Sequence, residues 1–191
     1  MANGFGRIIH WDGDLYEGEW YNNLKEGKGR LLYTSGAEYE GEWKNDMQHG
    51  YGIEKWPDGV IFRGHFESGL KKGFGTRILS SNSFYKGEFM NNEFHGRGTL
   101  LFRNGKKYVG EWKCGKMDGY GKLISLGMSS YVGNFKLGLK HGDGKMELID
   151  GRSYNGRWML GKVTGIGSYV SRKGEKARKC EVQNGIVLRW F

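Results

Sequence analysis

Aromatic and polar residues alternate along this chain in a pattern that returns every 23 residues. An aromatic residue, a glycine two positions later and a second aromatic residue two positions further on occur seven times in one register. The first aromatic set is Tyr16, Tyr39, Phe62, Tyr85, Tyr108, Tyr131 and Tyr154. The second aromatic set is Trp20, Trp43, Phe66, Phe89, Trp112, Phe135 and Trp158. Because side chains alternate between the faces of a β-strand, we expect both sets on one face and the often charged residues between them on the other.

A second strand is predicted in each repeat from a pair of glycines in the same register. Gly27 and Gly29 form the first pair, and the strand-forming residues Leu31 to Tyr33 follow. The turn between the two strands carries residues that tolerate a positive φ, namely Asn23, Asp46, Gly69, Asn92, Gly115, Gly138 and Gly161. Each repeat is therefore predicted to be a β-hairpin that pairs with its neighbours. The predicted fold class is all-β: an elongated, single antiparallel twisted sheet of stacked hairpins, shaped as a trough-like rod.

The pattern also divides the chain. Residues 4–13 match only the second strand of a repeat, residues 14–170 contain seven repeats, and residues 171–191 form a degenerate repeat. Ala177 stands where an aromatic residue is expected, while Asn184-Gly185 is a strong signal for a hairpin turn. We interpret the last segment as a C-terminal hairpin cap, since repeat arrays end in atypical units.

The unit Tyr39-Glu40-Gly41-Glu42-Trp43, followed by His49-Gly50-Tyr51-Gly52, resembles the MORN (membrane occupation and recognition nexus) repeat. The resemblance extends from residue 4 to about residue 170. It implies an elongated β-sheet that acts as a scaffold in cilia, basal complexes and cell-division structures, or as an accessory region of junctional membrane proteins and plant lipid kinases. A MORN region is not catalytic by itself. The start in mid-repeat leaves two readings open, a truncated first repeat or a fragment of a longer array.

Composition supports a folded, non-secreted protein. The chain has 35 glycines but one proline, which excludes collagen, and 15% aromatic residues, which argues against disorder. Two cysteines cannot build a disulfide framework, and no apolar run is long enough for a signal sequence or a membrane span. We expect a location in the cytoplasm or on the cytoskeleton, with a cilium or basal structure as one form of it.

Charge is distributed unevenly. Residues 1–68 carry 7 Lys/Arg and 12 Asp/Glu, whereas residues 69–191 carry 23 Lys/Arg and 9 Asp/Glu. A basic end stands out, formed by Arg172, Lys173, Lys176, Arg178 and Lys179. Two interpretations remain open for this end: contact with an acidic cytoskeletal protein such as tubulin or with a phosphoinositide membrane, or a solvated edge that blocks strand pairing.

The motifs that suggest chemistry are explained better by the repeat. Gly156 to Lys162 resembles the start of a phosphate-binding loop, but Val163 replaces the required Ser or Thr and a strand follows. His49, His95 and His141 lie two repeats apart, roughly 19 Å along a sheet, which is too far to share one zinc ion. We therefore expect no enzyme activity, no cofactor and no metal, and the regular aromatic spacing argues against a nucleic-acid site.

The sequence thus predicts a protein-interaction scaffold. In this prediction an extended partner segment lies along a groove whose floor is formed by the two aromatic sets. The alternatives are peripheral binding to anionic phospholipid through the basic C-terminal half, and a targeting or regulatory region of a longer enzyme. The short apolar edge at Arg7 to Trp11 further predicts pairing with another strand, as a homodimer or an end-to-end oligomer.

Overall fold

The computed structural model describes residues 1–80 and 82–191, and within these residues it contains seventeen β-strands and no helix. The strands are β1 (Gly4–Ile9), β2 (Leu15–Tyr21), β3 (Leu24–Leu32), β4 (Glu38–Lys44), β5 (Met47–Lys55), β6 (Ile61–Glu67), β7 (Leu70–Ser80), β8 (Ser83–Met90), β9 (Glu93–Leu101), β10 (Lys107–Lys113), β11 (Lys116–Ser125), β12 (Ser129–Lys136), β13 (Leu139–Leu148), β14 (Ser153–Met159), β15 (Lys162–Val170), β16 (Arg178–Gln183) and β17 (Ile186–Trp190). The chain forms two compact units, Met1–Phe94 and His95–Phe191.

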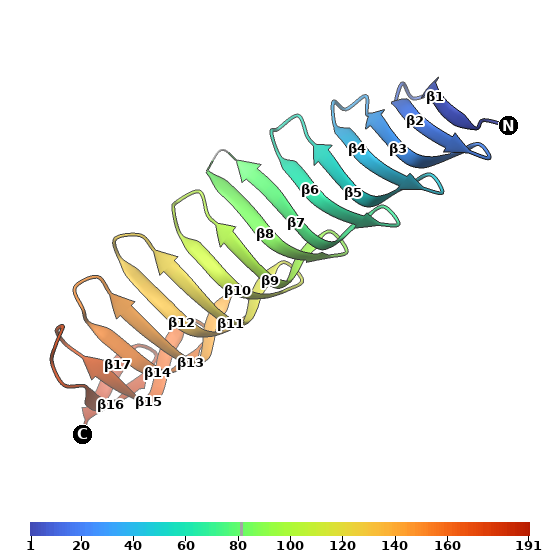
Figure 1. Cartoon of the computed structure of the whole chain (residues 1–191). Helices are drawn as coiled ribbons and strands as arrows, with labels where there is room; N and C mark the ends of the chain where they lie inside the picture. The colour runs from blue at the N-terminus through green and yellow to red at the C-terminus, as the bar shows by residue number, and fades with distance from the viewer. Residues whose placement is uncertain (81) are drawn as a thin grey trace. The chain divides into compact units, whose positions relative to one another are not determined.

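Strand pairing follows the order of the sequence in both units. In the first unit every strand from β1 to β8 pairs antiparallel with the next (Figure 1). In the second unit the same holds from β9 to β17. Glycines of successive strands face one another, as Gly18 does with Gly6 on one side and Gly29 on the other. The prediction of an all-β fold made of stacked antiparallel hairpins is confirmed.

The hairpin turns are tight because their residues adopt the left-handed conformation. Asn22 and Asn23 have φ angles of 49° and 66°, and two consecutive positive φ values are what a two-residue type I′ turn requires. Every predicted turn residue of the seven repeats has a positive φ. In the repeat that begins at Tyr108, the residue pair is Cys114 and Gly115, so Cys114 lies in a turn and is exposed.

The glycine pairs make room for the first aromatic set. A Cβ atom at Gly29 would collide with the hydroxyl and ring of Tyr16, and one at Gly52 would collide with Tyr39 in the same way. The Tyr ring therefore lies flat over two glycines of adjacent strands, where only a residue without a side chain is accommodated.

The last hairpin departs from the repeat by one residue. Tyr169 pairs with Arg178, Gly167 with Cys180 and Gly165 with Val182. Compared with the pairing of Leu31 with Tyr39, this register places Arg178, not Ala177, where the first aromatic residue would stand. The interpretation of Ala177 as that position was wrong, because the loop before β16 is one residue longer than its counterparts and the spacing alone does not reveal this.

Candidate partner-binding surface

The two aromatic sets form a continuous ladder within each unit. Tyr16, Tyr39, Phe62, Tyr108 and Tyr131 each contact one ring of their own repeat and one ring of the next. Tyr16 meets Trp20 at 5.1 Å and Trp43 at 5.2 Å between centroids, with the rings nearly perpendicular. Tyr131 in the second unit meets Phe135 at 5.1 Å and Trp158 at 5.2 Å. Edge-to-face contacts of this kind are each worth about 0.5–1.5 kcal/mol beyond the burial of apolar surface.

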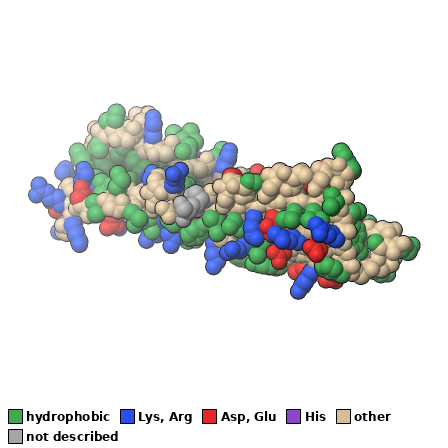
Figure 2. Space-filling model, turned by 90° about the horizontal axis from the view of Figure 1, so that it is seen from above, with side chains coloured by type: hydrophobic (Ala, Val, Ile, Leu, Met, Phe, Trp, Pro, Cys, Tyr) green, Lys and Arg blue, Asp and Glu red, His purple; other side chains and the backbone are tan. Residues whose placement is uncertain are grey.

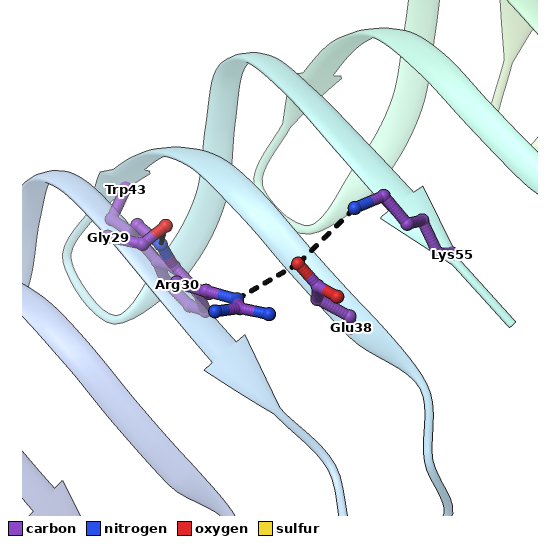
Figure 3. Close-up of polar contacts among 5 residues, drawn as sticks. All are labelled: Gly29, Arg30, Glu38, Trp43 and Lys55. Carbon is purple, nitrogen blue, oxygen red and sulfur yellow. Dashed lines mark hydrogen bonds and ion pairs between the residues drawn. The ribbon is translucent and has the colours of Figure 1, made fainter.

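Backbone carbonyl oxygens accept hydrogen bonds from polar tips of the ladder, with the Tyr154 hydroxyl as an exception. The Tyr16 hydroxyl donates to the carbonyl oxygen of Glu19 at 3.0 Å, and Trp43 Nε1 donates to the carbonyl oxygen of Gly29 at 3.1 Å (Figure 3). Burial raises the pKa of the Tyr16 and Tyr131 hydroxyls to about 12. The ladder is therefore a core, held by ring contacts and by hydrogen bonds to its own strands.

The predicted groove floor is filled by its own rings. All residues of the two aromatic sets except Trp20 are buried, and Tyr16, Tyr39, Phe62, Tyr85 and Tyr108 have no exposed surface. The expectation of an open aromatic floor is corrected by this burial, because each ring lies over glycines and between two other rings. A direct role of these rings in binding a partner stays a prediction, and it would require the ladder to open.

Recurring glutamates on the face opposite the rings also have a structural role. Glu19 Oε1 accepts a hydrogen bond from the backbone N–H of Lys28 at 3.1 Å, and Glu42 Oε1 accepts one from that of Tyr51 at 2.9 Å. These carboxylates hold the irregular backbone at the glycine pair, where the pairing between the two strands of a hairpin shifts register. Strand alternation predicted the face on which the glutamates lie but not these hydrogen bonds. The signal that could have identified them is their fixed position directly before the second aromatic residue.

An open groove lies on the face away from the rings, in the first unit. We call it the first-unit groove; its volume is about 500 Å³ and its lining comes from strands β1 to β5. Two of its aromatic side chains are open to solvent, Phe5 by 72% and Tyr51 by 50%. The groove is lined by Phe5, Glu17, Lys28, Gly29, Arg30, Glu40, Gly41, Glu42, Tyr51 and Ile53. The sequence signal for it is the residue inside each Gly-x-Gly pair, which strand alternation places opposite the rings.

One wall of the first-unit groove is fixed by ion pairs. Glu38 accepts from Arg30 Nε at 2.9 Å and lies 3.4 Å from Lys55 Nζ, so it joins three consecutive strands (Figure 3). The Arg30 guanidinium, by its hydrogen bond, holds the pKa of the Glu38 carboxyl below its usual value. The lining carries three carboxylates, Glu17, Glu40 and Glu42, against the two basic side chains Lys28 and Arg30, so negative charge is in excess by one.

The basic end lies on and beside the last hairpin. Arg178 and Lys179 belong to β16, where the Arg178 guanidinium lies 4.6 Å from the Trp190 ring centroid and Lys179 Nζ lies 5.3 Å from that of Phe191. Arg172, Lys173 and Lys176 are exposed in the preceding loop. On the face that Figure 2 shows, basic side chains stand in several groups, some of them interspersed with acidic ones.

The described residues offer no site for metal chemistry. Across residues 1–80 and 82–191 there is no group of three or more His, Cys, Asp or Glu side chains that could hold an ion. Over the same residues, no helix is long and apolar enough to cross a bilayer.

The comparisons with known proteins identify the family. A model of the MORN repeat matches residues 16–38, 39–61, 62–84, 85–107, 108–125 and 131–151, which together make up more than half of the chain. The chain therefore belongs to the MORN-repeat family. The comparison with curated proteins finds no match.

Two solved structures illustrate how distant the structural likenesses are. The TCP domain of SAS-4 (dCPAP) of Drosophila melanogaster, in complex with a proline-rich motif of Ana2 (dSTIL), is 10% identical; the match covers 92% of this chain and 88% of that one, with a TM-score of 0.49. The wild-type TCP10 domain of Danio rerio CPAP, in complex with a peptide of STIL, is 10% identical over 100% and 96% of the two chains, with a TM-score of 0.34. Similarity at this level establishes neither a shared fold nor a shared partner.

Proposed function

We propose that this chain is a non-catalytic scaffold that binds an extended segment of a partner protein in the first-unit groove. The observation that carries the proposal is the exposure of Phe5 and Tyr51 within one open groove, on the face opposite the buried rings of the two aromatic sets. Large rings at the centre of an interface provide most of its binding energy. Membership of the MORN family supports a binding role over a catalytic one.

The groove also defines the chemistry of the segment. Its lining extends from β1 to β5, about 19 Å at the usual strand spacing, which corresponds to roughly six extended residues. Phe5, Tyr51 and Ile53 offer apolar contact, while Glu17 and Glu40 favour positive charge. We therefore expect a partner segment that combines apolar side chains with lysine or arginine.

Selection from a phage-displayed library of random peptides on the intact chain tests the proposal. The peptide that is enriched is synthesised, and its Kd is measured by isothermal titration calorimetry. Tyr51→Ala should raise that Kd by about tenfold or more, because it removes an exposed ring that anchors the segment.

The chain contains a matched control for this variant. Tyr120 has the same place in its Gly-x-Gly pair three repeats later, in the second unit, and is 57% exposed. Tyr120→Ala should leave the Kd unchanged. Equal losses from the two variants, no loss from Tyr51→Ala, or no enriched peptide at all would each reject the groove as the binding site.

A second candidate function follows from the charge of the second unit. The exposed basic end supports attraction to an anionic surface, at roughly 1 kcal/mol for each lysine or arginine held near it. Two assays rank an anionic membrane against the microtubule as the partner. One is flotation with vesicles that contain phosphoinositide, compared with neutral vesicles, and the other is co-sedimentation with microtubules. Reversal of Arg172, Lys173, Lys176 and Lys179 to glutamate should abolish the preferred interaction. A cytoskeletal or ciliary location and end-to-end or dimeric association stay predictions of the sequence.

A further inference from the structure

The ladder of the second unit lacks one ring at its last step. Tyr131 lies between Phe135 of its own repeat and Trp158 of the next. For Tyr154, among the described residues, the only ring in aromatic contact is Trp158, and the centroid distance is 6.1 Å instead of 5.1–5.2 Å. In the same part of the chain the Tyr154 hydroxyl finds no hydrogen-bond partner, whereas the Tyr131 hydroxyl donates to the carbonyl oxygen of Asn134 at 3.0 Å.

The register explains the missing ring. Gly142 pairs with Trp158, and the equivalent Gly165 pairs with Val182. Val182 is buried but has a far smaller side chain than tryptophan. The last hairpin therefore continues the sheet without supplying the ring that every preceding repeat of this unit receives from its successor.

Separately from that gap, a cavity of about 160 Å³ lies beside Tyr154, between Leu148 of β13 and Val163 of β15. At the same place beside Tyr131 the longer Lys140 covers the ring, with its Nζ 5.1 Å from the ring centroid. We call the cavity beside Tyr154 the terminal cavity. Most of its lining is apolar, and its polar members, Arg152 and Ser153, precede Tyr154 on the chain. Arg152 Nε is paired with Asp150 at 2.8 Å. The cavity is lined by Met146, Leu148, Arg152, Ser153, Tyr154, Trp158, Val163 and Tyr169.

We propose that the terminal cavity binds one aromatic ring, a phenyl or indole group carried by a side chain of a partner protein. This would be a second contact, separate from the first-unit groove. The occupant is an aromatic ring because the ring of Phe94 fills the equivalent place over Tyr85 in the first unit. The volume of the terminal cavity is also sufficient for one ring, since an apolar cavity of about 150 Å³ accommodates benzene.

The first unit shows that a ring is accepted on this side of the ladder. Phe94 occupies the register place of Val163, three repeats earlier, and stacks on Tyr85 with 3.8 Å between centroids and 8° between planes. A phenylalanine at residue 163 should therefore cover Tyr154 in the same way and fill the terminal cavity from within.

Methyl NMR of the full chain tests the proposal. The probe is N-acetyl-L-phenylalanine amide, and N-acetyl-L-alanine amide is the control that lacks a ring. The phenylalanine probe should produce saturable shifts at the methyl groups of Met146, Leu148 and Val163, and the alanine probe should produce none. No saturable shift at these methyl groups, or equal shifts with both probes, would overturn the proposal.

Variants locate the binding. Val163→Phe should lower the affinity for the phenylalanine probe by about tenfold or more, because the new ring occupies the cavity. Leu148→Trp enlarges the side chain on the opposite wall, gives the same expected loss, and serves if Val163→Phe does not fold. Met117→Phe is the matched control, since Met117 has the same register place beside Tyr108, whose two ring neighbours are present. Unchanged affinity in a folded Val163→Phe or Leu148→Trp, or an equal loss in Met117→Phe, contradicts a site at the terminal cavity.

Discussion

Tyr131 and Tyr154 stand in identical places of neighbouring repeats, and their surroundings differ. Tyr131 is held by two rings and a hydrogen bond. Tyr154 has one ring at a longer distance and an adjoining cavity. In this unit a repeat is thus completed by its successor, as nearest-neighbour coupling in a solenoid requires. The last repeat, without that partner, is packed less tightly around its tyrosine.

Removing the whole tyrosine side chain should give the largest difference in stability between the Tyr131 and Tyr154 sites. Tyr131→Ala should lower the free energy of unfolding by about 3–5 kcal/mol, because it empties a buried, fully packed site. Tyr154→Ala should cost clearly less, since its ring already borders a cavity. Urea unfolding of both variants measures the difference. Equal losses would show that the two rings are equally well packed.

Adding a methyl group at a glycine beside each tyrosine should give the next largest difference in stability. A Cβ atom at Gly133 would meet the backbone of Gly144 and Asp143 more closely than the Tyr131 hydroxyl, whereas one at Gly156 would meet the Tyr154 hydroxyl and ring first. Gly133→Ala should cost about 1–3 kcal/mol, because the paired backbone has no space into which it can move. Gly156→Ala should cost less, as Tyr154 can shift into the terminal cavity. A larger cost at Gly156 would speak against that freedom.

Alkaline pH should weaken the ladder as a whole. Burial raises the pKa of Tyr131 to about 12, above the value near 10 expected in the unfolded chain. Between these values the unfolded state loses the proton first, so the stabilisation present below about pH 10 is lost as the pH approaches about 12. Tyr131→Phe should reduce this loss, as seen in urea midpoints across a pH series. If Tyr131→Phe loses the same amount of stability at alkaline pH, that loss does not arise from the Tyr131 hydroxyl.

The smallest effect concerns the two hydroxyls alone. Tyr131→Phe should cost about 0.5–1.5 kcal/mol at neutral pH, because a hydrogen bond to the backbone is removed. Tyr154→Phe should be neutral or slightly stabilising, because its buried hydroxyl has no partner among the described residues. Precise denaturation curves of the two variants decide the matter, and a matching cost would mean that Tyr154 is hydrogen-bonded in solution.

The repeat made most of the fold predictable. Strand alternation placed the rings on one face, and residues such as Asn23 and Gly69 marked turns that do adopt positive φ. Local signals sufficed because each hairpin contacts only its neighbours in the chain.

The binding surface was less predictable, because it depends on how the space over the sheet is filled. The sequence did not show that Tyr16 lies flat over Gly29 and closes the expected floor. Nor did it show that Glu42 turns to the backbone of Tyr51, or that one extra loop residue brings Val182 to the place of a tryptophan. These features arise from packing between strands, which spacing alone does not specify.

The cavity beside Tyr154 is tested most directly by a crystal structure of the chain under xenon pressure. Xenon enters apolar cavities of this size. The account predicts xenon density beside Tyr154, between Leu148 and Val163, and none beside Tyr131, where Lys140 covers the ring. Absence of xenon at Tyr154, or equal occupancy at the two tyrosines, would contradict it.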